Sequence, residues 1–215
     1  MRAYERLLKY AKVYTTSDPE SGTHPSAARE FDLAHLLVEE MKSIGIEDAF
    51  VDEHCYVYGS IPATKGCEKK PALGLIAHMD TSPAVSGADI HPEIVTYQGG
   101  DLPLKKAGSL KVKDFPFLER YIGQELIVTD GTTLLGADDK AGVAEIVTAC
   151  EYLLAHPEVP HRAIAVCFTP DEEVGKGADH FDPEKFPARA AYTVDGGELG
   201  EIEYLSLIHI SEPTR

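Results

Sequence analysis

The sequence predicts an α/β fold, a mixed and largely parallel sheet with helices on both faces. Short apolar runs of strand length alternate with longer stretches in which apolar residues recur every three or four positions. The runs end in Gly, Pro, Asp or Ser, which are typical of the ends of strands. With 215 residues, 43% of them hydrophobic, the chain can bury one large core or two small ones.

Helical periodicity predicts three helices, over residues 2–14, from about Ala27 to Ile44, and over 139–155, with Gly45 ending the second. Residues 81–125 are rich in Gly, Pro and Asp and predict an insertion with one hairpin. Strands are predicted at Ala49–Asp52, Tyr56–Ile61, Leu73–His78, 125–130, 163–170 and 190–197.

Charge and composition exclude several classes of protein. A formal net charge of -16 argues against binding nucleic acid or an anionic membrane surface. Apolar runs stay well below the ~18 residues of a membrane span, and the N-terminal segment lacks the continuous apolar stretch of a secretory leader. Cys55, Cys67, Cys150 and Cys167 show no C-x-x-C spacing, so we expect reduced thiols in a cytoplasmic protein.

The segment GLIAHMDTSP (74–83) ends a predicted strand with His78 and Asp80. Side chains alternate along a strand, so both residues point to the same side. A metal-binding imidazole usually donates its other N–H to a carboxylate, and His78 with Asp80 suits that arrangement. Taken alone, the pair is more typical of a histidine beside a turn-capping aspartate.

Three further apolar runs are followed by acidic residues and glycine. GADDKAG (136–142) follows TLL, TPDEEVGKG (169–177) follows AIAVCF, and TVDGGE (193–198) follows AAY. Carboxylates gathered at one edge of a sheet repel one another unless cations lie between them. One imidazole with several carboxylates suits Zn²⁺, with Mn²⁺ or Co²⁺ as substitutes, and Asp138 or Asp139 is the natural bridge between two metals.

The motifs AHMDTSP, LLGADDKAG, FTPDEEVGKGA-x-HFD and YTVDGG carry a family resemblance. In order and spacing they resemble the co-catalytic zinc metallopeptidase family that includes glutamate carboxypeptidases, aminoacylases and succinyl-diaminopimelate desuccinylase. GADDKAG together with FTPDEEVGKGA is specific to its tripeptide aminopeptidase branch. The resemblance extends from the N-terminal helix to about Tyr204.

The resemblance implies a role for each matching residue. His78 is expected to bind the first zinc with Asp195, and Asp80 to hold its imidazole. Asp138 corresponds to the bridging ligand, whereas Asp139 corresponds to a variable position and is left out of the metal shell. Glu173 is expected to bind the second zinc. Glu172 is expected to act as the general base toward water in hydrolysis of the first peptide bond of a tripeptide. A cis peptide bond is expected at Asp138–Asp139.

The sequence departs from the family at its end. The family's last zinc ligand is a downstream histidine that no remaining histidine matches, and Ser206–Arg215, with His209, resembles a non-native tail. We therefore expect residues 1–205 to be the N-terminal part of a catalytic domain, incomplete and without the lid or dimerisation domain. Such a fragment is expected to bind at most one zinc well and to be inactive, whereas the complete enzyme is expected to form a homodimer.

Other functions remain open from the sequence. A deacylase or carboxypeptidase of the same family would share every metal ligand. A non-catalytic metal-binding fragment is a second alternative, although the acids are scattered rather than grouped in one EF-hand loop. A nucleotide-binding module is disfavoured because EVGKGAD lacks the earlier Gly and the following Ser or Thr of a phosphate loop.

Overall fold

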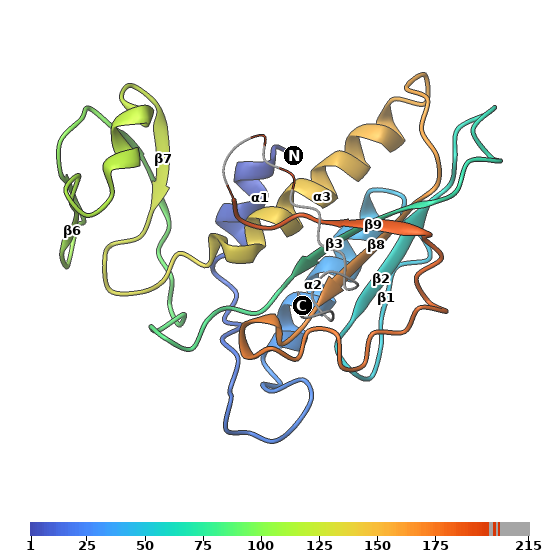
Figure 1. Cartoon of the computed structure of the whole chain (residues 1–215), viewed down its shortest axis with the longest axis horizontal. Helices are drawn as coiled ribbons and strands as arrows, with labels where there is room; N and C mark the ends of the chain where they lie inside the picture. Colours follow the sequence, from blue (N-terminus) through green and yellow to red (C-terminus); the bar gives the residue numbers. More distant parts are fainter. Residues whose placement is uncertain (198–199, 201, 203–215) are drawn as a thin grey trace, which may run out of the picture.

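A five-stranded sheet forms the centre of the computed structural model, which describes residues 1–197, 200 and 202 (Figure 1). The strand order is β1-β2-β8-β3-β9. β1 pairs antiparallel with β2, and β2 with β8, whereas β3 runs parallel to both β8 and β9. The predicted α/β class with a mixed sheet is confirmed. The strands are β1 (Phe50–Val51), β2 (Val57–Ile61), β3 (Leu73–His78), β8 (Ile164–Thr169) and β9 (Ala190–Thr193).

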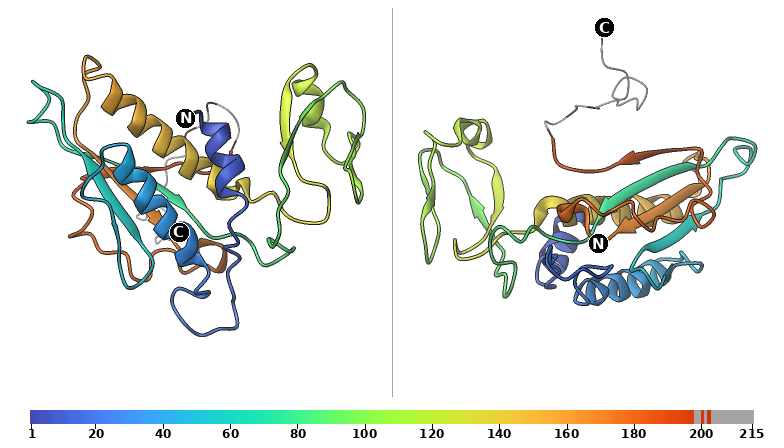
Figure 2. Two further views of the ribbon diagram at one scale, coloured as in Figure 1. Left: turned by 180° about the vertical axis from the view of Figure 1, so that it is seen from behind. Right: turned by 60° about the horizontal axis from the view of Figure 1, so that its bottom comes forward.

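Three α-helices, α1 (Ala3–Tyr10), α2 (Glu30–Ser43) and α3 (Ala137–Ala155), lie against one face of this sheet (Figure 2). The sequence predicted helices on both faces. In the described part of the chain, the irregular segment 181–188 covers the other face, where Phe186 packs against Tyr58 and Cys167. Strands buried on both sides are apolar throughout, so their composition does not reveal which side carries helices.

Two of the helices are shorter than the apolar pattern predicts. α1 ends at Tyr10 rather than at residue 14, and α2 begins at Glu30 rather than near Ala27. Gly45 has a φ of 105° and follows the last turn of α2, as predicted. A positive φ costs glycine little because it has no Cβ, which makes it a common residue after a helix.

The insertion is larger than the single hairpin predicted for it. β4 (Glu93–Thr96) pairs with β7 (Glu125–Val128), and β5 (Leu102–Pro103) pairs with β6 (Ser109–Leu110). A 3₁₀ helix, η1 (Pro116–Tyr121), lies between β6 and β7 in the sequence. The strand predicted at 125–130 therefore belongs to this lobe and not to the central sheet. Figure 1 shows the lobe beside the sheet, joined to it by the chain after β3 and before α3.

The four cysteines are free and buried, which confirms the prediction of core thiols. A helix of sufficient length and hydropathy to cross a bilayer does not occur among the residues that the structure describes.

A buried guanidinium joins the three helices. Arg6 of α1 is 1% exposed, and its Nε donates to Glu40 of α2 at 2.8 Å. Its remaining nitrogens donate to Thr148 and Glu151 of α3 and to the Met1 carbonyl. A buried ion pair of this kind fixes geometry, and loss of one partner leaves the other charge buried without compensation.

Gly142 sets the distance between α3 and the chain after β9. A Cβ at this position would lie 2.0 Å from the Val194 carbonyl oxygen and 2.5 Å from Oδ1 of Asp139. Because backbone occupies that space, a side chain fits only if α3 moves away from the sheet.

Arg6→Met should lower the free energy of unfolding by about 3–5 kcal/mol, because Glu40 would remain buried without its main partner. Urea denaturation followed by circular dichroism measures this. Lys9→Met is the control, since Lys9 binds the same carboxylate but is 41% exposed, and its loss should cost less than about 1 kcal/mol. Equal effects of the two substitutions would contradict a special role for the buried guanidinium.

Gly142→Ala should destabilise the chain by about 1–3 kcal/mol through overpacking. Gly197→Ala is the matched control, because nothing lies within 4 Å of a Cβ at Gly197 and its φ is unexceptional. That control should change the stability by less than about 0.5 kcal/mol. Thermal unfolding compares the two variants, and an unaffected melting temperature in Gly142→Ala would show that α3 shifts freely.

Candidate metal centre

Three parallel strands end at the same edge of the sheet and deliver the candidate residues. His78 is the last residue of β3, the 3₁₀ helix η2 (Glu172–Val174) follows β8, and Asp195 follows β9. The apolar run TLL before GADDKAG is not a strand in the structure, so Asp138 does not follow a strand end. Asp138 instead lies at the start of α3, after Gly136, whose φ of 72° turns the chain.

The start of α3 is irregular at both acids. Asp138 and Asp139 have non-helical backbone angles, and the peptide bond between them is cis, as the family resemblance predicted. The Asp138 carboxylate lies beside the imidazole of His78, with 71% of its side chain exposed, whereas Asp139 is buried.

The imidazole of His78 is 2% exposed and has different partners at its two nitrogens. Nδ1 lies 3.1 Å from the Asp80 carbonyl oxygen and 3.3 Å from Asp80 Oδ1. Nε2 faces three carboxylates, at 2.9 Å from Asp138, 3.7 Å from Glu172 and 3.9 Å from Asp195. One nitrogen is thus anchored in the protein, and the other is directed toward a group of ligand atoms.

Asp80 is fully buried and connects the end of β3 to the loop after β8. Its two carboxylate oxygens accept the backbone N–H groups of Glu172 and Glu173 at 3.0 Å, and Oδ2 also accepts the Ser17 hydroxyl at 2.5 Å. Burial opposes ionisation, but the contacts with His78 and Ser17 outweigh it and lower the pKa of Asp80. The residue expected to orient His78 therefore also holds η2 in place.

Asp139 lies closer to the site than the sequence indicated. It is 2% exposed, and its oxygens accept the backbone N–H of His78 and of Gly142, both at 3.2 Å. Its ligand atom lies within 4.8 Å of those of His78 and Asp195. The sequence signal was present, since Asp139 belongs to the same acidic pair, but spacing alone does not say which of two adjacent acids turns inward.

The charges of the site are poorly balanced without a cation. Burial and the nearby Asp195 raise the pKa of Asp139 to about 8, and burial and Asp138 raise that of Glu173. Burial alone would lower the pKa of His78, but Asp80 and the surrounding carboxylates raise it to about 10. A divalent cation in this position would relieve the repulsion between the acids.

The donor set fits such an ion. Two groups of ligand atoms lie within 4.8 Å of one another, His78 with Asp139 and Asp195, and His78 with Asp138 and Glu173. Imidazole nitrogen and carboxylate oxygen are donors that zinc accepts readily. All four predicted metal ligands therefore lie together, with Asp80 and Glu172 beside them.

Three histidines outside the predicted ligand set, His24, His54 and His180, pack against one another with ring centroids 4.2–5.9 Å apart. None of the three belongs to a candidate metal-binding group of the described residues. Lys140 is buried at the start of α3 and donates to the Val13 carbonyl, which is a structural role. His209 and the expected tail lie outside the described residues.

Comparison with known proteins matches this chain to peptidases. The sequence profile of Peptidase family M20/M25/M40 matches residues 128–215. Peptidase T of Alkaliphilus oremlandii is 56% identical over 204 residues, and that of Geobacillus kaustophilus is 53% identical over 205 residues. These alignments cover 93% and 94% of this chain but 50% of each relative. The chain thus spans about half the length of these curated relatives.

Solved structures share the fold. A tripeptidase from Staphylococcus aureus superposes with a TM-score of 0.62 at 23% identity, covering 91% of this chain and 43% of that structure. The aminopeptidase PepT of Bacillus cereus gives a TM-score of 0.62 at 24% identity, with the same coverage. In sequence, the chain is similar to peptidase T over about half of that protein's length, and it shares the fold of these solved peptidase structures.

Proposed function

We propose that residues 1–205 are part of the catalytic domain of a zinc aminopeptidase that releases the N-terminal residue of tripeptides. The carrying observation is the arrangement around His78, whose Nδ1 is anchored by buried Asp80 while Nε2 faces carboxylates from three separate segments. The similarity to peptidase T at 53–56% identity supports the substrate class.

The ligands divide between two metal positions. By the family resemblance, His78, Asp138 and Asp195 would hold the first zinc, and Asp138 would share the second with Glu173. In the structure, the ligand atoms of His78 lie together with those of Asp138 and Glu173, and also with those of Asp139 and Asp195. Among the described residues, His78 supplies the one imidazole at this place. We therefore propose that this chain binds one zinc well at most and that its own peptidase activity is negligible.

Zinc, when bound in this site, supplies a Lewis acid that polarises a carbonyl and lowers the pKa of water. Glu172 is 54% exposed, and its carboxylate lies 3.7 Å from Nε2 of His78, beside the metal ligands. It is therefore placed to take a proton from water and to return it to the leaving amine. Asp80 accepts the backbone N–H groups of Glu172 and Glu173 and so holds this segment in place. The side chain of Glu173 remains available as a metal ligand.

A cytoplasmic location and a homodimeric full-length enzyme belong to the same proposal. Four free buried cysteines suit a reducing compartment. The acidic surface expected from a net charge of -16 gives no support for nucleic-acid or membrane partners. Small peptides are the proposed binding partners.

Zinc titration by calorimetry should give one tight site in this chain, and His78→Ala should remove it. Glu172→Gln should keep it, because the proposed general base is not a ligand. In a chain of the relatives' full length, Glu172→Gln should lower kcat for trialanine by about 10²–10⁴. Two tight sites in the present chain, or clear cleavage of trialanine by it, would contradict the proposal.

Zinc binding at pH 7 should release about one proton or more per ion. The pKa of His78 near 10 means that its ring carries a proton at pH 7 in the metal-free chain, and this proton must leave before Nε2 can bind a metal. Calorimetry in phosphate and in Tris separates the proton count from the binding enthalpy. Identical heats in the two buffers would show that the imidazole is already neutral.

A further inference from the structure

The segment 15–17 lies along the chain that follows β3, close to the candidate metal centre. Thr16 and Thr81 form a parallel β-bridge. The Ser17 backbone N–H donates to the Thr81 carbonyl at 3.1 Å, and the Thr81 N–H donates to the Thr15 carbonyl at 3.2 Å. The side chains of all three residues of the segment are buried. The segment is therefore fixed in place by its own backbone pairing.

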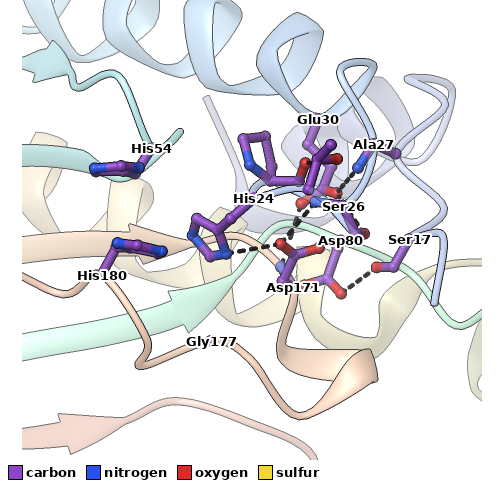
Figure 3. Close-up of polar contacts among 12 residues, drawn as sticks. Ser17, His24, Ser26, Ala27, Glu30, His54, Asp80, Asp171, Gly177 and His180 are labelled. Carbon is purple, nitrogen blue, oxygen red and sulfur yellow. Dashed lines mark hydrogen bonds and ion pairs between the residues drawn. The ribbon is translucent and has the colours of Figure 1, made fainter. Parts of the chain in front are cut away.

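The Ser17 hydroxyl connects this segment to the candidate metal centre (Figure 3). Ser17 is 2% exposed, and its Oγ donates to Oδ2 of Asp80 at 2.5 Å. An ionised carboxylate can only accept hydrogen bonds, so the hydroxyl is the donor. A hydroxyl–carboxylate contact of this length is typical of a charge-assisted hydrogen bond, which is stronger than one between neutral groups.

Each carboxylate oxygen of Asp80 meets one side chain and one backbone N–H. Oδ1 lies 3.3 Å from Nδ1 of His78 and accepts the Glu172 N–H at 3.0 Å. Oδ2 accepts the Ser17 hydroxyl at 2.5 Å and the Glu173 N–H at 3.0 Å. Contacts on both oxygens fix the plane of the carboxylate, because rotation of the plane would lengthen several of them at once.

Ser17 differs from the other partners of Asp80 because it does not belong to the proposed metal centre. His78 is a proposed metal ligand and η2 carries the proposed general base, so both depend on Asp80 for their alignment. Ser17 is instead held by the backbone pairing of its own segment, and Nε of Arg29 donates to the Thr16 carbonyl at 2.7 Å. A hydroxyl on a fixed segment can therefore set the orientation of the carboxylate.

We propose that Ser17 is a positioning residue of the metal centre, whose hydroxyl fixes the Asp80 carboxylate. Through Asp80 it aligns His78 and holds the loop of Glu172 and Glu173. Ser17 acts through Asp80 and is not itself a metal ligand. Its role in the metal centre rests on the proposed function, whereas its hold on η2 is a property of the metal-free chain.

Amide hydrogen exchange in EDTA tests the hold on η2. In Ser17→Ala the Asp80 carboxylate loses one of its contacts and turns more freely, which weakens its bonds to the η2 backbone. The amides of Glu172 and Glu173 should therefore exchange about two- to tenfold faster than in the parent, which corresponds to the loss of roughly one hydrogen bond. Exchange resolved by NMR measures these two rates directly.

Zinc affinity at pH 7, measured by calorimetry, tests the role in the metal centre. Ser17→Ala should bind zinc about fivefold more weakly than the parent. Loss of the direct partner of a metal-binding histidine typically costs about 10–100-fold in affinity. The expected loss for Ser17 is smaller because its hydroxyl acts one contact further from the metal.

Thr15→Val is the matched control for both measurements. Thr15 is fully buried in the same segment, and its hydroxyl donates to the Met79 carbonyl at 2.8 Å rather than to Asp80. This substitution removes a buried hydroxyl and leaves the contacts of the Asp80 carboxylate in place. Its zinc affinity and the exchange rates of the η2 amides should stay within about twofold of the parent.

The outcomes separate the two parts of the proposal. Parental exchange rates at Glu172 and Glu173 in a folded Ser17→Ala would overturn the hold on η2, and parental zinc affinity would overturn the role in the metal centre. Equal losses in Thr15→Val would show general packing by the segment and would also overturn the proposal. If Ser17→Ala does not fold, Ser17→Cys replaces it, with losses in the same direction expected because a thiol is a weak donor. If the parent binds no zinc, the proposed function and the role in the metal centre fail together, and amide exchange still decides whether Ser17 holds η2.

Discussion

The candidate metal centre depends on one buried carboxylate, that of Asp80. It contacts Nδ1 of His78, accepts the backbone N–H groups of Glu172 and Glu173, and accepts the Ser17 hydroxyl. A fully buried carboxylate is stable only when hydrogen bonds replace its lost hydration. The contacts that keep Asp80 ionised also align His78, Glu172 and Glu173. The same hydrogen bonds therefore stabilise both the charge of Asp80 and the geometry of the site.

The placement of the candidate residues at one edge of the sheet was predictable because it is encoded locally. His78 and Asp80 are separated by one residue at the end of an apolar run, and an alternating strand places such residues on one side. Strands β3, β8 and β9 are parallel neighbours, so the residues after them meet at one edge. The resemblance to a family of metallopeptidases then selected Asp138 over Asp139 as the bridging ligand, which spacing had left open.

Features that depend on distant partners were not predictable in this way. The apolar strands β2 and β8 gave no sign that the described helices pack on one face while residues 181–188 cover the other. The role of Asp139 depends on the backbone N–H groups of His78 and Gly142, which the fold brings to it. No local pattern in the sequence predicts that Glu30 is fully buried beside Asp171.

The acids of the site form two sets with different surroundings. Asp80, Asp139 and Asp171 are buried, and each accepts backbone N–H groups, so their positions are fixed before any ion arrives. Asp138, Glu172 and Asp195 are 71%, 54% and 36% exposed in their side chains, and they face the same imidazole nitrogen. Exposed carboxylates keep most of their hydration and can exchange water for a cation at little cost. Buried acids in fixed positions beside exposed, hydrated acids are consistent with a site that binds a divalent ion and leaves room for water and a peptide.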